Sequence, residues 1–167
     1  MTTPGTSPIS PPTTAATSGE AGSVRAEQDA LQLALAAEHA AVWGYGTVGA
    51  ALAEGTRAEV LAAQQAHRDL RDRVSGLLEA AGVDPVPTEA AYALPFPVLS
   101  AVDAAALAVT LEDGTTAAWV YVLDQAAERS TRELAVAAAS AAEVRAVSWR
   151  GQAGRVSVTS ATPGLPG

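Results

Sequence analysis

A glutamate in the middle of an apolar helical stripe constrains this chain more than any other feature of its sequence. Seven residues recur at alternating steps of four and three, which places their side chains on one helix face: Leu31, Leu35, Glu38, Val42, Tyr45, Gly49 and Leu52. Burying a bare carboxylate in such a face costs several kcal/mol, so Glu38 must be paired, protonated or bound to a metal. The sequence therefore predicts a helical core that contains polar chemistry.

Composition favours an all-α protein with one core. The chain has 167 residues, only 4% of them aromatic, and its commonest residue is alanine, the best helix former. The formal net charge of −8 disfavours nucleic-acid binding, and the absence of cysteine excludes disulfides and thiolate ligands. We see no secretory signal and no apolar stretch of about twenty residues that could span a membrane. We therefore expect a soluble, cytoplasmic helical protein.

Turn and capping residues divide the chain into four helices and two tails. Residues 1–22, rich in Pro, Thr, Ser and Gly, are expected to form a disordered tail, and residues 151–167 a flexible C-terminal tail that docks on the bundle or frays. The expected domain covers residues 23–150, with helices at about 24–53, 56–81, 100–127 and 130–150. Thr56 with Glu59 and Ser130 with Glu133 are predicted to be capping boxes that open the second and fourth helices.

A long connection separates the second and third helices. Four prolines between residues 82 and 100 force extended backbone, yet the segment also carries Tyr92, Leu94 and Phe96, so we expect an ordered strap over the helices. Two tight hairpins joined by one crossover are typical of ferritin-like proteins. The sequence therefore predicts a ferritin-like antiparallel four-helix bundle with a long crossover between helices 2 and 3.

Each predicted helix carries an ionisable side chain on its apolar face, near its middle: Glu38, His67, Glu112 and Glu143. This layout is similar to a carboxylate-bridged di-metal centre, which takes one Glu from each of two helices and Glu-x-x-His from each of the other two. Such ligands suit iron or manganese. Two ligands are missing, because Gln64 and Ala146 stand where the pattern needs Glu and His. One interpretation is a single Fe or Mn ion held by some of the four remaining side chains.

The other interpretation is a degenerate centre whose carboxylates are neutralised by arginine. Counted from the first hairpin, Glu38 and His67 differ in depth by about 8–9 Å along the helix axis, whereas Arg71 lies nearer to the level of Glu38. We therefore predict a buried ion pair between Glu38 and Arg71, with Arg150 helping Glu143 in the same way. The protein would then be a structural or interaction module without catalytic residues or an identified substrate, and it could dimerise through Ala/Gly-rich helix faces.

Residues 44–49 match the pattern Gly-x-Gly-x-x-Gly. The dinucleotide-binding fingerprint needs a strand before it and a helix after it, whereas this match lies in the middle of a predicted helix. We therefore expect the glycines to let another helix approach closely.

Five short motifs stand out along the chain, at residues 36–46, 67–72, 92–98, 111–114 and 149–150. Together they resemble an uncharacterised, alanine-rich, ferritin-like domain family of actinobacteria, and Tyr-Ala-Leu-Pro-Phe-Pro is the most specific of them. The resemblance covers most of residues 27–150. It implies a ferritin-like bundle of unassigned function and supplies no catalytic residues.

Overall fold

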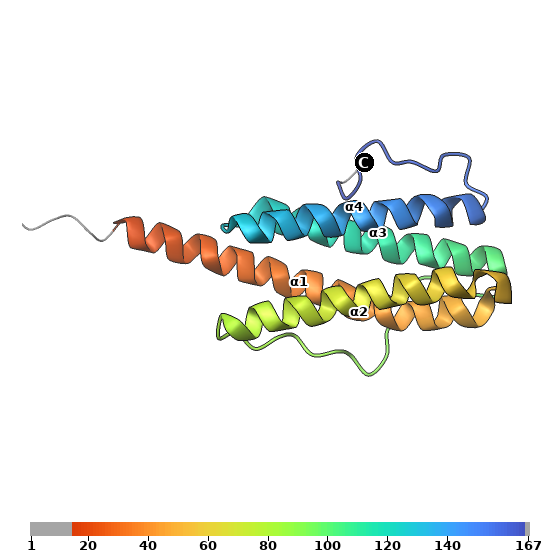
Figure 1. Cartoon of the computed structure of the whole chain (residues 1–167), viewed down its shortest axis with the longest axis horizontal. Coiled ribbons are helices and arrows are strands. Elements are labelled where there is room, and N and C mark those ends of the chain that lie inside the picture. Colours follow the sequence, from red (N-terminus) through yellow and green to blue (C-terminus); the bar gives the residue numbers. More distant parts are fainter. Residues whose placement is uncertain (1–14, 166–167) are drawn as a thin grey trace, which may run out of the picture.

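Residues 15–165 are described by a computed structural model and contain four α-helices. The helices are α1 (Ala15–Ala51), α2 (Arg57–Ala80), α3 (Ala101–Gln125) and α4 (Arg129–Gln152), and a short 3₁₀ helix, η1 (Glu54–Thr56), joins α1 to α2. In Figure 1, α1 runs antiparallel to α2 and to α3, and α3 runs antiparallel to α4. This confirms the predicted all-α four-helix bundle with its long crossover between α2 and α3.

The first helix begins earlier than the sequence predicted. Residues 15–22, assigned to the disordered tail, belong to α1, which extends past the end of the other helices (Figure 1). Residues 1–14 of that tail lie outside the described residues. Residues 19–25 are exposed, so helix propensity rather than packing supports this extension. The prediction gave too much weight to Gly19 and Gly22, each of which costs only about 1 kcal/mol in a helix.

A side chain caps α3, whereas the capping box predicted for α2 does not form. Ser100 precedes α3, and its Oγ accepts a hydrogen bond of 3.1 Å from Asp103 N. Asp103 in turn accepts a hydrogen bond of 3.1 Å from Leu99 N, which completes a reciprocal capping arrangement. Thr56 does not cap α2, because its hydroxyl donates to Ala53 O at 2.8 Å.

A remote carboxylate replaces the predicted capping box at the start of α4. The helix begins at Arg129, and neither Ser130 nor Glu128 caps it with a side chain. Instead, Glu27 of α1 accepts hydrogen bonds of 2.8 Å from Glu128 N and from the Thr131 hydroxyl. The two helices are thereby tied together at this end of the bundle.

Two apolar clusters lie on either side of a polar layer. One includes Leu35 of α1, Val74 of α2 and Trp119 of α3, and the other includes Val48 of α1 and Val60 of α2. Along three of the helices, a buried polar residue lies between the two clusters: Glu38 on α1, His67 on α2 and Glu112 on α3. The polar layer is therefore shielded from both ends of the bundle.

The connection between α2 and α3 is an ordered strap, as predicted. The Gln32 side chain of α1 donates to Asp84 O and accepts from Val86 N, both at 2.7 Å. Farther along the strap, Tyr92 packs on Trp43 with 5.8 Å between the ring centroids. These contacts fix the strap along the outer side of α1.

The glycine motif at residues 44–49 lies inside α1, so it lacks the strand that a dinucleotide-binding turn requires. A Cβ atom on Gly44 would lie 2.7 Å from Leu111 Cδ1. Gly44 therefore permits the close approach of α1 and α3, which confirms the packing role predicted for this motif. Gly46 has open space where a Cβ would lie, so it contributes nothing to this contact.

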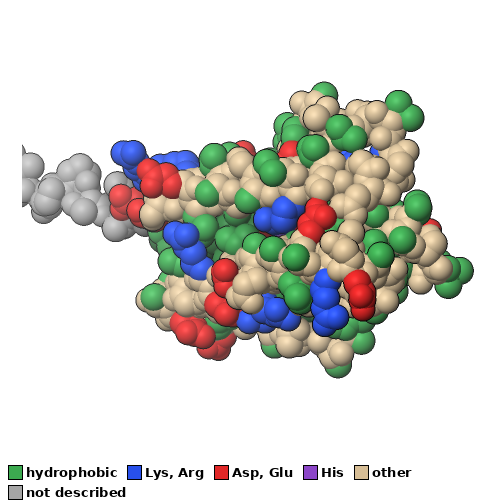
Figure 2. All heavy atoms as spheres, turned by 45° about the vertical axis from the view of Figure 1, so that its right-hand side comes forward, with side chains coloured by type: hydrophobic (Ala, Val, Ile, Leu, Met, Phe, Trp, Pro, Cys, Tyr) green, Lys and Arg blue, Asp and Glu red, His purple; other side chains and the backbone are tan. Residues whose placement is uncertain are grey.

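The surface has a mixed character. On the face shown in Figure 2, acidic and basic side chains are interspersed, with hydrophobic side chains scattered among them. Within the described part of the chain, no helix has the length and apolar character needed to cross a membrane.

Candidate functional site

Three of the four predicted site residues meet at the centre of the bundle. Glu38, His67 and Glu112 are each 0% exposed. His67 Nδ1 lies 2.6 Å from Glu38 Oε2, and His67 Nε2 lies 3.3 Å from Glu112 Oε1. A protonated imidazole donates from both ring nitrogens, so His67 of α2 bridges carboxylates on α1 and α3.

Aromatic side chains supply further donors to the two carboxylates. Trp119 Nε1 donates to Glu38 Oε1 at 2.7 Å, and the Tyr45 hydroxyl donates to Glu112 Oε1. Trp149 Nε1 of α4 donates to the Tyr45 hydroxyl at 2.8 Å. The buried polar atoms of these aromatic residues are therefore satisfied by protein groups, as burial requires.

Arg145 of α4 brings a second cation to this cluster. Its Nε donates to Glu112 Oε1 at 2.8 Å, and its side chain is only 19% exposed. The two cations, protonated His67 and Arg145, formally balance the two carboxylates. Among the described residues, Glu112 Oε2 and Arg145 Nη2 are buried without a hydrogen-bond partner.

The contacts shift the pKa values of His67, Glu112, Tyr45 and Arg145 in directions that stabilise this charge arrangement. Burial alone would lower the pKa of His67, but hydrogen bonds to Glu112 and Glu38 outweigh it and raise the pKa. Burial would raise the pKa of Glu112, but hydrogen bonds from His67 and Arg145 hold it below its usual value. Burial and the neighbouring Glu112 raise the pKa of Tyr45 far above its usual range, so its phenol stays protonated.

The predicted ion pair between Glu38 and Arg71 does not form, and His67 takes the place of Arg71. Arg71 Nη2 instead lies 2.7 Å from Asp72 Oδ1 at the surface. Because α1 ends at Ala51 and α2 begins at Arg57, Glu38 and His67 differ in depth by three residues. This is about 4.5 Å along the axis, roughly half the difference expected from the sequence, and the two side chains span it.

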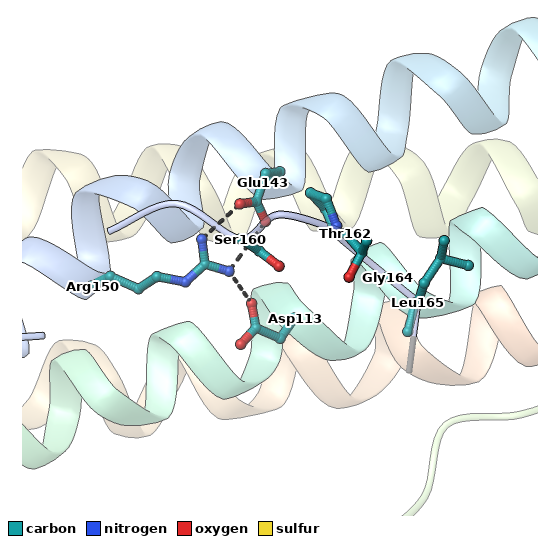
Figure 3. Close-up of a pocket in the computed structure, with 9 residues that line it drawn as sticks. Asp113, Glu143, Arg150, Ser160, Thr162, Gly164 and Leu165 are labelled. Carbon is teal, nitrogen blue, oxygen red and sulfur yellow. Dashed lines mark hydrogen bonds and ion pairs between the residues drawn. The ribbon is translucent and has the colours of Figure 1, made fainter. Parts of the chain in front are cut away.

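Glu143 does not join the cluster. It faces the C-terminal segment, where its two carboxylate oxygens accept hydrogen bonds of 2.7 and 3.1 Å from the Arg150 guanidinium (Figure 3). The predicted contact between Arg150 and Glu143 is confirmed, but it lies apart from Glu38, His67 and Glu112.

Arg145 was not among the predicted site residues, because the polar residues of α4 indicate a different inward face from the one observed. Four-three spacing through Glu143 predicts an inward face of Val136, Ser140, Glu143, Val147 and Arg150. Of these only Arg150 is buried, and the buried face carries Ala135, Ala138, Ala142, Ala146 and Trp149. Alanine occurs on both faces of this helix and gives little signal. Trp149 was the available marker, because steps of four and three back from it reach Arg145 and Ala142.

The arrangement does not match a preformed metal site. A metal needs a free imidazole lone pair, yet both His67 nitrogens face carboxylate oxygens. Trp119 donates to the second oxygen of Glu38, and Tyr45 and Arg145 donate to Glu112 Oε1, the same oxygen that faces His67. No group of three or more His, Cys, Asp or Glu side chains within the described residues is arranged to hold a metal ion. As placed, these side chains neutralise one another.

Comparisons with known proteins define the family. A family model described as a domain of unknown function (DUF4439) matches residues 30–167. Among solved structures, the chain is similar to the crystal structure of a conserved hypothetical protein, rv2844, from Mycobacterium tuberculosis. The two are 39% identical with a TM-score of 0.75, and the match covers 76% of this chain and 96% of that chain. No curated protein matches. The chain belongs to the DUF4439 family of domains of unknown function.

Proposed function

We propose that this protein is a structural or interaction module with a ferritin-like architecture and a degenerate di-metal centre. The observation that carries the proposal is the charge balance of the buried cluster, in which Arg145 and protonated His67 offset Glu38 and Glu112. In this arrangement, the cluster joins all four helices and needs no metal to neutralise its acids.

Burial of the cluster argues against catalysis there. Glu38, His67 and Glu112 are each 0% exposed, so a substrate would have to separate the helices to reach them. The module would then act by binding partners at its surface. A homodimer through Ala/Gly-rich faces is one form of this proposal, and bare glycines such as Gly46 and Gly76 on α1 and α2 are compatible with it.

Metal content tests the proposal directly. The protein is purified from cells supplied with iron and manganese, and bound metal is measured by elemental analysis beside a Glu112→Gln variant. We expect no stoichiometric metal in either protein. One ion per chain in the wild type, lost in the variant, would overturn the proposal. Sedimentation of the same samples tests the homodimer, since a strict monomer at all concentrations would remove that form.

The second candidate function is binding of a single Fe or Mn ion. It is favoured by the convergence of Glu38, His67 and Glu112, and by the buried Glu112 Oε2 that has no partner among the described residues. These side chains would have to rearrange, with His67 turning a neutral nitrogen toward the ion. Titration with Mn²⁺ that raises the melting temperature of the wild type but not of His67→Gln would favour this function. No shift in either protein would exclude it.

A further inference from the structure

The C-terminal segment, residues 153–165, folds back over α3 and α4 and is held at two points. Arg150 Nη1 donates to Val158 O at 3.1 Å. Gly164 has a φ of +75°, and a Cβ there would lie 2.6 Å from Val120 Cγ2. The family match extends to residue 167, so this segment is part of the domain rather than an appendage.

A cleft of about 480 Å³ lies between this segment and the two helices. Its floor is formed by Asp113 and Ala117 of α3 with Glu143 and Arg150 of α4, and residues from Ser160 to Leu165 cover it (Figure 3). A second hollow of about 730 Å³ shares Ala117, Gly164 and Leu165 with the first and continues toward Tyr121 and Leu123. Clefts of this size are typical of small-molecule sites.

The charge of the cleft selects against anions. The terminal nitrogens of Arg150 are committed to both oxygens of Glu143, to Asp113 Oδ1 at 2.5 Å and to Val158 O. Arg150 therefore has no terminal donor left for a bound carboxylate or phosphate. Asp113 is 45% exposed, and its second oxygen makes no hydrogen bond to the described residues. Two carboxylates face one arginine, so the cleft carries net negative charge.

The rest of the lining combines apolar surface with hydroxyl groups. Ala117 and Leu165 line both the acidic hollow and the hollow that Tyr121 and Leu123 also line. Thr116 lines an adjoining hollow beside Pro163; it is only 1% exposed, and its hydroxyl has no partner among the described residues. A ligand that matches this lining has one cationic head and an apolar body.

We propose that the cleft binds a small organic amine, with its ammonium group on Asp113 and its hydrocarbon body across Ala117 and Leu165 toward Tyr121. Ser160 and Thr162 lie in the same lining, and hydroxyl oxygens can accept from an ammonium group. This site is separate from the buried cluster, so it goes beyond the proposed function and does not depend on the metal question.

Ligand chemistry provides the first test. Hexylamine, hexanol and hexanoate have the same chain and differ in charge, and their binding to the full chain is followed by NMR chemical shifts. We expect hexylamine to shift the resonances of residues around the cleft, hexanol to bind at least about tenfold more weakly and hexanoate not to bind, because a charge-assisted hydrogen bond is the stronger one. Equal binding of all three compounds, or shifts elsewhere on the protein, would overturn the proposal.

Substitutions in the cleft provide the second test. Asp113→Asn should weaken hexylamine binding at least about tenfold, whereas Asp69→Asn on α2 should leave it unchanged. Gly164→Ala forces a Cβ against Val120 and displaces the segment, so it should abolish binding while the helical content stays the same. The matched control is Gly76→Ala, where a Cβ has nothing within 4 Å. Unchanged binding in Gly164→Ala would show that the segment forms no part of the site, and the proposal would fail.

Discussion

Two ion clusters begin from consecutive residues of α3, whose side chains lie about 100° apart around the helix axis, and each cluster includes an arginine of α4. Glu112 points into the core and meets His67 and Arg145, whereas Asp113 points outward and meets Arg150. Both use a carboxylate and an arginine at hydrogen-bond distance. They differ in burial, because Glu112 is 0% exposed and Asp113 is 45% exposed at its side chain.

The difference shows how burial determines what an ion pair contributes. Water solvates the outer carboxylate in the folded and unfolded states alike, so its pair with Arg150 adds little to stability. Water does not reach the Glu112 carboxylate in the folded protein. Loss of one of its partners therefore leaves an unpaired charge in the core. Glu112 therefore contributes more to holding the helices together than Asp113 does, although Arg150, the partner of Asp113, is itself buried.

Removing the two carboxylates in turn should produce the largest difference. Glu112→Ala leaves His67 and Arg145 without their shared partner, so we expect a loss of about 3–5 kcal/mol of unfolding free energy. Asp113→Ala should cost about 1 kcal/mol or less. Urea denaturation of the two variants measures both values. Equal losses would contradict the assignment of Glu112 to the core network.

A smaller effect is expected when an indole donor is removed and an aromatic ring is kept. Trp119→Phe deprives Glu38 of the hydrogen bond from Nε1 and should cost about 1–3 kcal/mol. The control is Trp43→Phe, at a partly buried position under the strap, which we expect to cost clearly less. Denaturant midpoints give the comparison. If Trp43→Phe were the more damaging change, the polar layer would not be the main tie between α1 and α3.

The pH dependence of stability should also come from the inner cluster. His67 titrates near 6.5 when unfolded and at a higher pKa when folded, so its contribution is complete below 6.5 and is lost as pH rises through the folded value. Glu112 has a folded pKa below 4.5, so its contribution is complete above 4.5 and is lost as pH falls through the folded value. Stability should therefore be greatest between these two unfolded-state values and fall on both sides.

The two histidines of the chain provide a matched pair for this test. His67→Gln should remove the decline on the alkaline side, in addition to lowering overall stability. His39→Gln should leave the decline in place, because His39 Nε2 hydrogen-bonds to Val86 O of the strap, away from the carboxylates of the buried cluster. Denaturation midpoints measured across the pH range for both variants decide the matter. If stability still declined at alkaline pH in His67→Gln, a group other than His67 would be responsible for the decline.

Much of the fold could be predicted because the helix signals are local. Ser100 and Asp103 open α3, and Gly82, with a φ of +72°, follows the end of α2. The failures occurred where distant contacts replaced local ones. The start of α4 depends on Glu27, which lies 101 residues before the backbone amide that it accepts from. No short sequence pattern contains that information.

The candidate site shows the same difference between local signals, which could be predicted, and distant contacts, which could not. Glu38, His67 and Glu112 could be predicted because four-three spacing places an ionisable side chain on the inward face of each of their helices. Their partners could not, because helix register and depth decide whether His67 or Arg71 meets Glu38. Arg145 was hidden by the alanine-rich face of α4, where packing rather than hydrophobicity marks the inward side.

The smallest predicted effect concerns the outer cluster, which consists of Asp113, Glu143 and Arg150. It tests whether the C-terminal segment can open locally without unfolding of the bundle. Arg150→Gln removes the ion pairs to Glu143 and Asp113 and weakens the hydrogen bond to Val158 O. Because the Arg150 side chain is only 7% exposed whereas Asp113 is 45% exposed, we expect a global loss of about 1–2 kcal/mol. Local opening should nevertheless increase, because few buried contacts hold this part of the chain. Hydrogen exchange should therefore become faster in residues 153–165 while the amides around His67 keep their protection. Faster exchange at both sites would mean that the two clusters are coupled through α3, and their different burial would then not make them independent.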